Sequence, residues 1–203
     1  MAKLVFGMMQ SLDGYIAGVA GGTQLPPPGD QLARHFNDQF RAIAGMVFGR
    51  RMYEVMRYWD DDQPDWDAAD RDFAMTWRAK PKWVASRTLK DVGPNATLIR
   101  DDTIAFVRKL REEISGEIDV AGPELAGSLT ASRLIDEYRL YFRPFVLGGG
   151  KPYFAGPLPA LRLVGAEPVG EDAVRLTYAT EPGASRNVEG VDVDAYVRAV
   201  RRR

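Results

Sequence analysis

Two glycines of this chain stand where a short apolar run passes directly into a helical pattern. Gly49 follows the run MVF at 46–48, and Gly122 follows IDVA at 118–121. Neighbouring parallel strands need a long crossover between them, usually a helix, so strand-to-helix turns of this kind mark βαβ units. The chain is therefore predicted to have an α/β fold.

Apolar runs and helical periodicities alternate through the first two thirds of the sequence. Strands are predicted from the short apolar runs, and helices from apolar residues spaced three and four apart. After Asp136 the helices stop and successive strands follow, which favours antiparallel pairing. The predicted strands are 4–9, 46–49, 82–87, 96–100, 118–121, 138–147, 161–164 and 173–180, and the predicted helices begin near Asp30, Met52, Asp67, Asp102 and Glu124.

We expect one domain over residues 1–203, with a mostly parallel central sheet, an antiparallel C-terminal edge and helices on both faces. Residues 18–29 are rich in Gly and Pro and are predicted to form a surface loop. Asp30 is predicted to be the N-cap of the next helix. The apolar strand 141–147 is assigned to the sheet edge, and because exposed edges are normally covered, a homodimer is expected.

The composition narrows the choice of partners. An apolar fraction of 45% and a charged fraction of 27% are those of an ordinary globular protein. The 27 basic and 28 acidic residues give a net charge of −1, so nothing attracts nucleic acid or a membrane overall. The chain has no cysteine, and its N-terminal apolar run is too short for a signal peptide, so a cytoplasmic location is expected. The three acids at 60–62 lack a second set of ligands, so no metal site is expected.

Three strand ends carry residues suited to anions. Ligands of open α/β sheets collect beyond the carboxyl ends of the strands, where helix N-termini direct N–H groups at phosphates. The segments FGRR at 48–51 and AGPE at 121–124 have this form. A single such turn is more often a plain connection, whereas a pair favours a phosphate-containing ligand. Ser86, Arg87 and Thr88 follow another strand and suit a phosphomonoester such as the 2′-phosphate of NADPH. The segment GGGK at 148–151 lacks the context of either a Rossmann fingerprint or a P-loop.

Four motifs in order give the chain a family resemblance. They are SLDGYIA at 11–17, VFGRRMYE at 47–54, VAGPEL at 120–125, and the stretch from DEY at 136–138 to PFVLGGGKP at 144–152. Together they resemble a stand-alone reductase domain of the dihydrofolate-reductase-like superfamily. The branch is that of the riboflavin-type reductase, the C-terminal domain of bacterial bifunctional deaminase-reductases. The resemblance implies a three-layer sandwich with NADPH as cofactor.

The resemblance also implies roles for particular residues, carried over motif by motif. One set would lie beside the nicotinamide, a second at the cofactor phosphates, a third at the 2′-phosphate and a fourth in a second phosphate turn. Because Glu124 is a carboxylate, its side chain must point away from the anion for the last role to hold. The four sets are Ser11, Asp13 and Gly14; Gly49 and Arg50; Ser86 and Arg87; and Gly122, Pro123, Glu124 and Leu125.

The function implied is NADPH-dependent hydride transfer to a C=N or C=O bond of a small flat heterocycle related to pterin or aminopyrimidine. Tyr15 replaces a lysine common in the riboflavin-pathway reductase, and no deaminase domain accompanies the chain, which argues against a riboflavin-pathway role. Dihydrofolate reduction and a nucleotide-binding module with little turnover are the alternatives. Asp30 is a weak candidate for proton donor, its capping role being favoured, and His35 is expected to be a partly exposed side chain.

Overall fold

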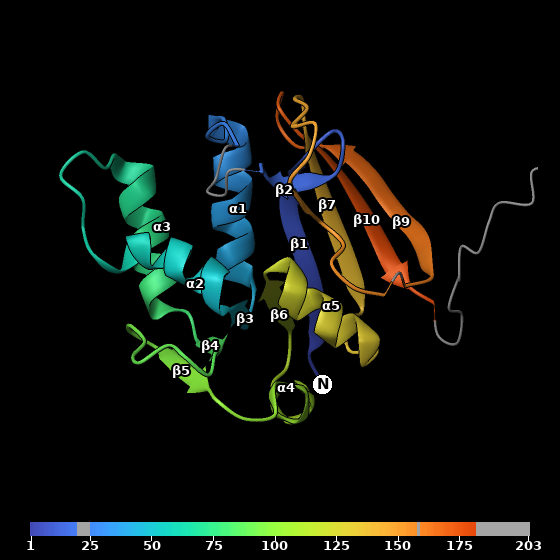
Figure 1. The fold of residues 1–203 in the computed structure, drawn as a ribbon. Helices are drawn as coiled ribbons and strands as arrows, with labels where there is room; N and C mark the ends of the chain where they lie inside the picture. The colour runs from blue at the N-terminus through green and yellow to red at the C-terminus, as the bar shows by residue number, and fades with distance from the viewer. Residues whose placement is uncertain (20–24, 158, 182–203) are drawn as a thin grey trace, which may run out of the picture.

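The computed structural model describes residues 1–19, 25–157 and 159–181, and residues 20–24 of the predicted loop lie outside them. Eight strands form one sheet in the order β5-β4-β3-β6-β1-β7-β10-β9, and two short strands form a separate ribbon (Figure 1). The strands of the sheet are β1 (Lys3–Ser11), β3 (Gly45–Gly49), β4 (Lys82–Ala85), β5 (Ala96–Ile99), β6 (Glu117–Ala121), β7 (Glu137–Arg143), β9 (Leu161–Pro168) and β10 (Val174–Thr180). The ribbon joins β2 (Tyr15–Ala17) and β8 (Lys151–Pro152).

The direction of the strands agrees with the sequence pattern. Every neighbouring pair from β5 to β7 is parallel, whereas β10 is antiparallel to both β7 and β9. The predicted mostly parallel sheet with an antiparallel C-terminal edge is confirmed. Because β1, β3, β4 and β6 are parallel, their carboxyl ends meet at one edge of the sheet, which is where ligands of such folds bind.

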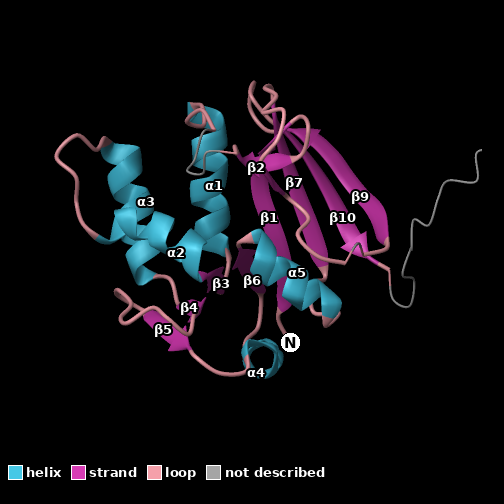
Figure 2. Ribbon diagram, viewed as in Figure 1, coloured by secondary structure: helices cyan, strands magenta, loops and turns pink. Residues whose placement is uncertain are grey.

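Helices cover both faces of the sheet (Figure 2). Side chains alternate between the faces along a strand, so Leu4 and Phe6 pack against α4 and α5, whereas Met46 and Phe48 pack against α2 and α3. Helix α1 packs against Tyr141 of β7. The result is the expected three-layer sandwich. The helices are α1 (Asp30–Ala42), α2 (Arg50–Met56), α3 (Ala68–Ala79), α4 (Thr103–Glu113) and α5 (Pro123–Ala131), with a 3₁₀ turn η1 (Arg57–Asp60) after α2.

The start of α1 differs from the prediction by one residue. Gly29 is the N-cap and Asp30 is the first helical residue, so Asp30 makes no side-chain cap. The Gly29 N–H is instead bound at 2.9 Å by Asp172, which comes from the turn before β10. A tertiary partner has taken the place of the local cap. Asp102, by contrast, caps α4 as predicted, because its side chain accepts the N–H of Ala105.

The strand predicted over 138–147 is shorter and lies elsewhere in the sheet. β7 ends at Arg143, where the N–H of Phe145 turns back to the Arg143 carbonyl at 2.8 Å. β7 is a central strand between β1 and β10, and the C-terminal edge strand is β9. A long apolar run is typical of a strand that is covered on both faces, and this explains the wrong assignment to an edge. In the described residues, no helix is long and apolar enough to cross a membrane.

Candidate functional site

The two strand-to-helix glycines lie against each other. β3 and β6 are paired as far as Phe48 and Ala121, so Gly49 and Gly122 leave neighbouring strands side by side. Gly122 has a φ of 112°, a conformation that residues with a side chain rarely adopt. A Cβ atom at Gly122 would lie 3.8 Å from the Gly49 nitrogen. The chain therefore keeps a cradle of bare backbone at the point where α2 and α5 begin.

Cationic side chains surround this cradle, and each is paired with a carboxylate. Arg50 binds Glu54 through one nitrogen at 2.9 and 3.1 Å. Glu124, the second residue of α5, lies 3.8 Å from Arg51 and 2.5 Å from Lys151. Burial raises the pKa of Glu124, but the hydrogen bond and charge of Lys151 and the charge of Arg51 outweigh it, so its pKa is lowered. Glu124 is held as a carboxylate.

Lys151 was missed at the sequence level because the segment GGGK matches no phosphate motif. Its place in the site depends on the ribbon, in which Lys151 of β8 pairs with Ala17 of β2. Gly150, at a φ of 137°, makes the close approach to this strand possible, since a Cβ atom there would lie 2.0 Å from the Ala17 carbonyl oxygen. The signal in the sequence that could have pointed to Lys151 was its place directly after three glycines.

β1 reaches further than its neighbour β6 at this edge. It pairs with β6 over Lys3–Phe6 but with β7 from Val5 to Ser11. Within the described residues, the last part of β1 therefore has a strand neighbour on one side only. The sheet has a step here, where β6 ends beside β1 and the Gly122 turn begins. A strand edge without a strand neighbour can offer backbone N–H and C=O groups to a polar ligand.

The loop after β1 is clamped to the loop after β7. The Ser11 hydroxyl donates to Asp13 at 2.5 Å, and Asp13 accepts the N–H groups of Leu147 at 3.1 Å and Gly148 at 2.7 Å. The pKa of Asp13 is lowered, chiefly by the hydrogen bond from Ser11, which outweighs the opposing effect of burial. Gly14 completes the turn with a φ of 85°. Asp13 thus holds the loop after β1 against the loop after β7, Ser11 and Gly14 shape the turn, and the Asp13 carboxylate is already occupied.

Ser86 and Arg87 lie just past the end of β4, at 85. The Ser86 hydroxyl accepts the N–H groups of Thr88 and Leu89 at 3.2 and 3.0 Å and so shapes the turn. Arg87 is exposed and forms no ion pair with any residue in the described ranges. The same loop is tied to α2, because the Tyr53 hydroxyl accepts the N–H of Gly93 at 2.7 Å. Arg87 is a cation presented to solvent at the same sheet edge.

A family model of the RibD C-terminal domain matches residues 2–175. This chain belongs to that family. It is similar to the uncharacterized protein YyaP of Bacillus subtilis, with 25% identity over 87% of this chain and 94% of that protein. A putative riboflavin biosynthesis protein from Shewanella has 25% identity and a TM-score of 0.68, covering 89% of this chain and 99% of that one. Dihydrofolate reductase from Enterococcus faecalis, solved with NADP(H), has a TM-score of 0.59 at 14% identity, covering 88% of this chain and 96% of that one.

These comparisons settle the fold and the kind of protein in which it occurs. This chain has the dihydrofolate-reductase-like α/β sandwich, a reductase-type fold. All four motifs that carry the resemblance lie within the matched residues 2–175.

Two titratable candidates of this RibD C-terminal domain protein lie away from the cradle. Asp30 is exposed in the first turn of α1 and makes no side-chain hydrogen bond with the described part of the chain. His35 is half-buried rather than free: its Nε2 lies 3.0 Å from the Tyr141 hydroxyl, which donates to Gln39 at 2.9 Å. Neutral His35 therefore donates from Nε2, and burial, followed by the charge of Arg175, lowers its pKa.

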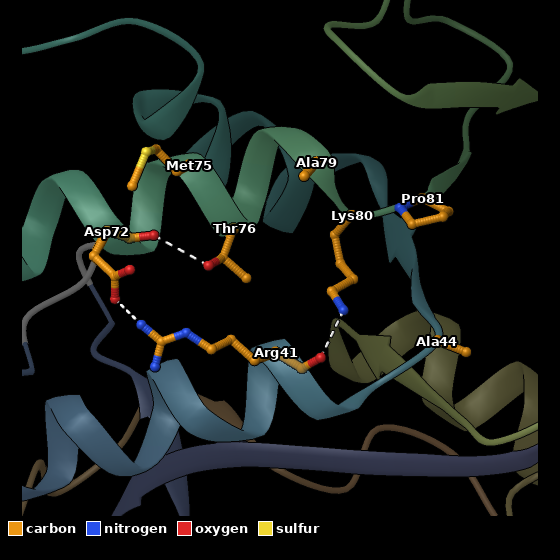
Figure 3. Close-up of a pocket in the computed structure, with 8 residues that line it drawn as sticks. All are labelled: Arg41, Ala44, Asp72, Met75, Thr76, Ala79, Lys80 and Pro81. Carbon is orange, nitrogen blue, oxygen red and sulfur yellow. Dashed lines mark hydrogen bonds and ion pairs between the residues drawn. The ribbon is translucent and has the colours of Figure 1, made fainter.

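A groove in the described residues lies elsewhere. It has a volume of about 390 Å³ and runs between α1 and α3 (Figure 3). Arg41 pairs with Asp72 across it, and the Lys80 ammonium donates to the Arg41 carbonyl at 2.9 Å. It contains none of the residues that the sequence assigned to a cofactor. It lies at the C-terminal end of α1, away from the carboxyl edge of the sheet.

Proposed function

We propose that this RibD C-terminal domain protein is an NADPH-dependent reductase acting on a small flat heterocycle related to pterin or aminopyrimidine. The observation that carries the proposal is a row of candidate residues along one sheet edge. The strands β4, β3, β6 and β1 are neighbours in the sheet; Ser86 and Gly122 directly follow β4 and β6, and Gly49 and Ser11 are the last residues of β3 and β1. Strands lie about 4.8 Å apart, so the row extends over roughly 15 Å across the strands, and Ser11 lies further out because β1 continues beyond the end of β6. An extended dinucleotide fits along such a row.

The middle of the row suits a diphosphate. Gly49 and Gly122 have no side chain that would keep a phosphate oxygen from the backbone, and the first turn of a helix such as α5 has N–H groups without a partner inside the helix. Arg50, Arg51 and Lys151 supply positive charge from two sides. Ser86 and Arg87 at one end would bind the 2′-phosphate, since a guanidinium pairs well with a phosphomonoester.

The other end of the row suits the nicotinamide. The free edge of β1 beyond Phe6 can pair with the carboxamide, and the clamped Ser11 to Gly14 loop would hold the ring and exclude water. The bound cofactor would supply the hydride. The chain's own contribution would be orientation of the reacting faces, because neither Asp30 nor His35 has the geometry of an established proton donor.

Cofactor oxidation on a panel of pterins, folates and aminopyrimidines tests the proposal. Turnover of any compound of the panel supports a reductase. Turnover of dihydrofolate would identify the protein as a dihydrofolate reductase, the second enzymatic hypothesis. Binding of NADPH with no oxidation on the whole panel would favour a nucleotide-binding module. Asp30 is exposed and makes no side-chain hydrogen bond with the described residues, and this observation keeps the module as an alternative.

We also propose that the protein is a cytoplasmic homodimer that binds neither nucleic acid nor a membrane. The strand that supports the dimer is β9, because β9 and not β7 is the C-terminal edge strand of the sheet. Within the described residues β9 pairs only with β10. Leu163 and Val164 of β9 are each 53% exposed and Val174 of β10 is 46% exposed, so this end of the sheet presents apolar side chains to solvent. Covering them against a second copy would remove both the apolar area and the free strand edge from water.

A further inference from the structure

Glu124 occupies an unexpected position for a residue beside a diphosphate. It lies one residue after Pro123, the first residue of α5, and two after Gly122, where anionic oxygens would meet backbone N–H groups. A second negative charge near a diphosphate opposes binding. Either the carboxylate is directed away, or it has a function that offsets the repulsion.

The contacts of Glu124 show what that function is. Its carboxylate meets Lys151 from β8 at 2.5 Å and Arg51 from α2 at 3.8 Å. These two cations belong to elements far apart in the sequence, and Glu124 is the group that brings them together. A carboxylate in the first turn also interacts favourably with the helix dipole, so Glu124 stands where an anion is stabilised.

The arrangement leaves Glu124 free to move away. Its side chain is 62% exposed, so it can turn into water without disturbing the core. The backbone of Lys151 stays in place without Glu124, because the β2–β8 pairing and the hydrogen bonds of Asp13 to Leu147 and Gly148 hold both ends of its loop. Only the side-chain partner of Lys151 needs to change.

We propose that Glu124 is an internal counter-ion that orders Lys151 and Arg51 and is displaced by the cofactor's diphosphate. This inference rests on the proposed function and deepens it, because it assigns the control of the affinity for NADPH to Glu124. The carboxylate competes with the ligand for the same two cations. Affinity for the dinucleotide is therefore lower than the cations alone would give, and release after reaction is easier.

Calorimetric titration of the full chain with NADPH, and separately with inorganic pyrophosphate, tests the inference on Glu124→Gln. The variant should bind both ligands about three- to tenfold more tightly, because a repulsive charge is gone and two cations are released. Lys151→Gln should bind both more weakly than the wild type. Glu112→Gln, the same charge change on the exposed face of α4, serves as the control and should behave like the wild type. Thermal melting of each variant checks that it is folded.

The outcomes separate this inference from the proposed function. Unchanged or weaker binding by folded Glu124→Gln, with normal NADPH binding by the wild type, overturns the counter-ion role and leaves the cofactor assignment standing. Tighter pyrophosphate binding by Glu124→Gln, with no NADPH binding by either protein, supports the counter-ion role and overturns the cofactor assignment. Failure of both ligands to bind any of these proteins overturns both.

Discussion

The carboxylate of Asp13 binds the backbone N–H of Gly148 at 2.7 Å across 135 positions of the sequence. This contact joins the SLDG segment after β1 to the glycine-rich segment after β7, two of the motifs by which the chain resembles its family. Both segments lie at the carboxyl edge of the sheet. Asp13 is therefore the residue that holds the two segments together beside the proposed cofactor site.

Replacing Asp13 by Asn should loosen the glycine-rich loop while the fold persists. Asn keeps one acceptor oxygen but loses the charge and the second acceptor, and charge-assisted hydrogen bonds are about twice as strong as neutral ones. Hydrogen exchange of the Leu147 and Gly148 amides should accelerate. Asp65→Asn, at an exposed position in the loop before α3, is the control. Unchanged exchange at both amides would show that Asp13 does not hold the loop.

Arg50→Ala should weaken NADPH binding by about 1.5–3 kcal/mol, the usual loss for a hydrogen bond to a charged group. Glu54→Gln, which removes the intrahelical partner of Arg50, should not weaken binding. Calorimetry on both variants makes the comparison. Equal affinity of Arg50→Ala and the wild type would remove Arg50 from the phosphate site.

Arg87→Ala should narrow the preference for NADPH over NADH. Arg87 is exposed at the end of the proposed row, and a guanidinium there can contact the 2′-phosphate, which NADH lacks. The dissociation constants of both cofactors for both proteins provide the measurement. If the variant loses affinity for the two cofactors by the same factor, the 2′-phosphate lies elsewhere.

Much of the fold was predictable because it depends on local patterns. The alternation of apolar runs with helical periods placed β1, β3, β4, β5 and β6, and the glycines at 49 and 122 marked the turns that carry the cradle. The short strand β2 was not predicted. The identity of the edge strand was not predictable. A central strand such as β7 and an edge strand that is covered by another element have the same apolar pattern. Only the pairing of β7 with β10 in the folded chain shows that β7 is central.

The charges of the site show a similar limit. Arg50 and Glu124 stand in recognisable turns, but the pair formed by Glu124 and Lys151 depends on how the ribbon folds over the sheet. His35 illustrates the same point, because its partner Tyr141 lies 106 positions away on another element. Sequence patterns locate residues on elements, and the packing of those elements decides which side chains meet.

Asp119 should make stability depend on pH. It is buried in β6 with one oxygen lacking a partner in the described structure, and burial, followed by the charge of Glu117, raises its pKa to about 8. The pKa of Asp119 in the folded state lies above its unfolded value of 3.8. The stability that the protonated Asp119 contributes is therefore complete below pH 3.8 and is lost as pH rises through about 8. Urea unfolding at pH about 5 and about 9 should show this loss.

The variant Asp119→Asn isolates this effect. An amide of similar shape carries no charge, so the variant should lose less stability than the wild type between the two pH values. Asp101→Asn, on the surface before α4, should retain the wild-type dependence. An identical pH dependence for Asp119→Asn and the wild type would show that Asp119 titrates normally.

The dimer proposed through β9 predicts about twice the chain mass in light scattering at micromolar concentration. Leu163→Asp should lower the mass to that of a monomer, because a charge at the interface opposes burial. Met75→Asp provides the matched control, since Met75 is 62% exposed on α3, and it should leave the mass unchanged. A wild-type monomer at every accessible concentration would rule out the dimer.

A crystal structure of the protein grown with NADPH tests the central claim most directly. The account predicts a dinucleotide extended along the carboxyl edge of the sheet, with its 2′-phosphate at Arg87, its diphosphate between Gly49 and Gly122, and its nicotinamide beside Ser11. A dinucleotide bound instead in the groove between α1 and α3, or reversed along the edge, would contradict it.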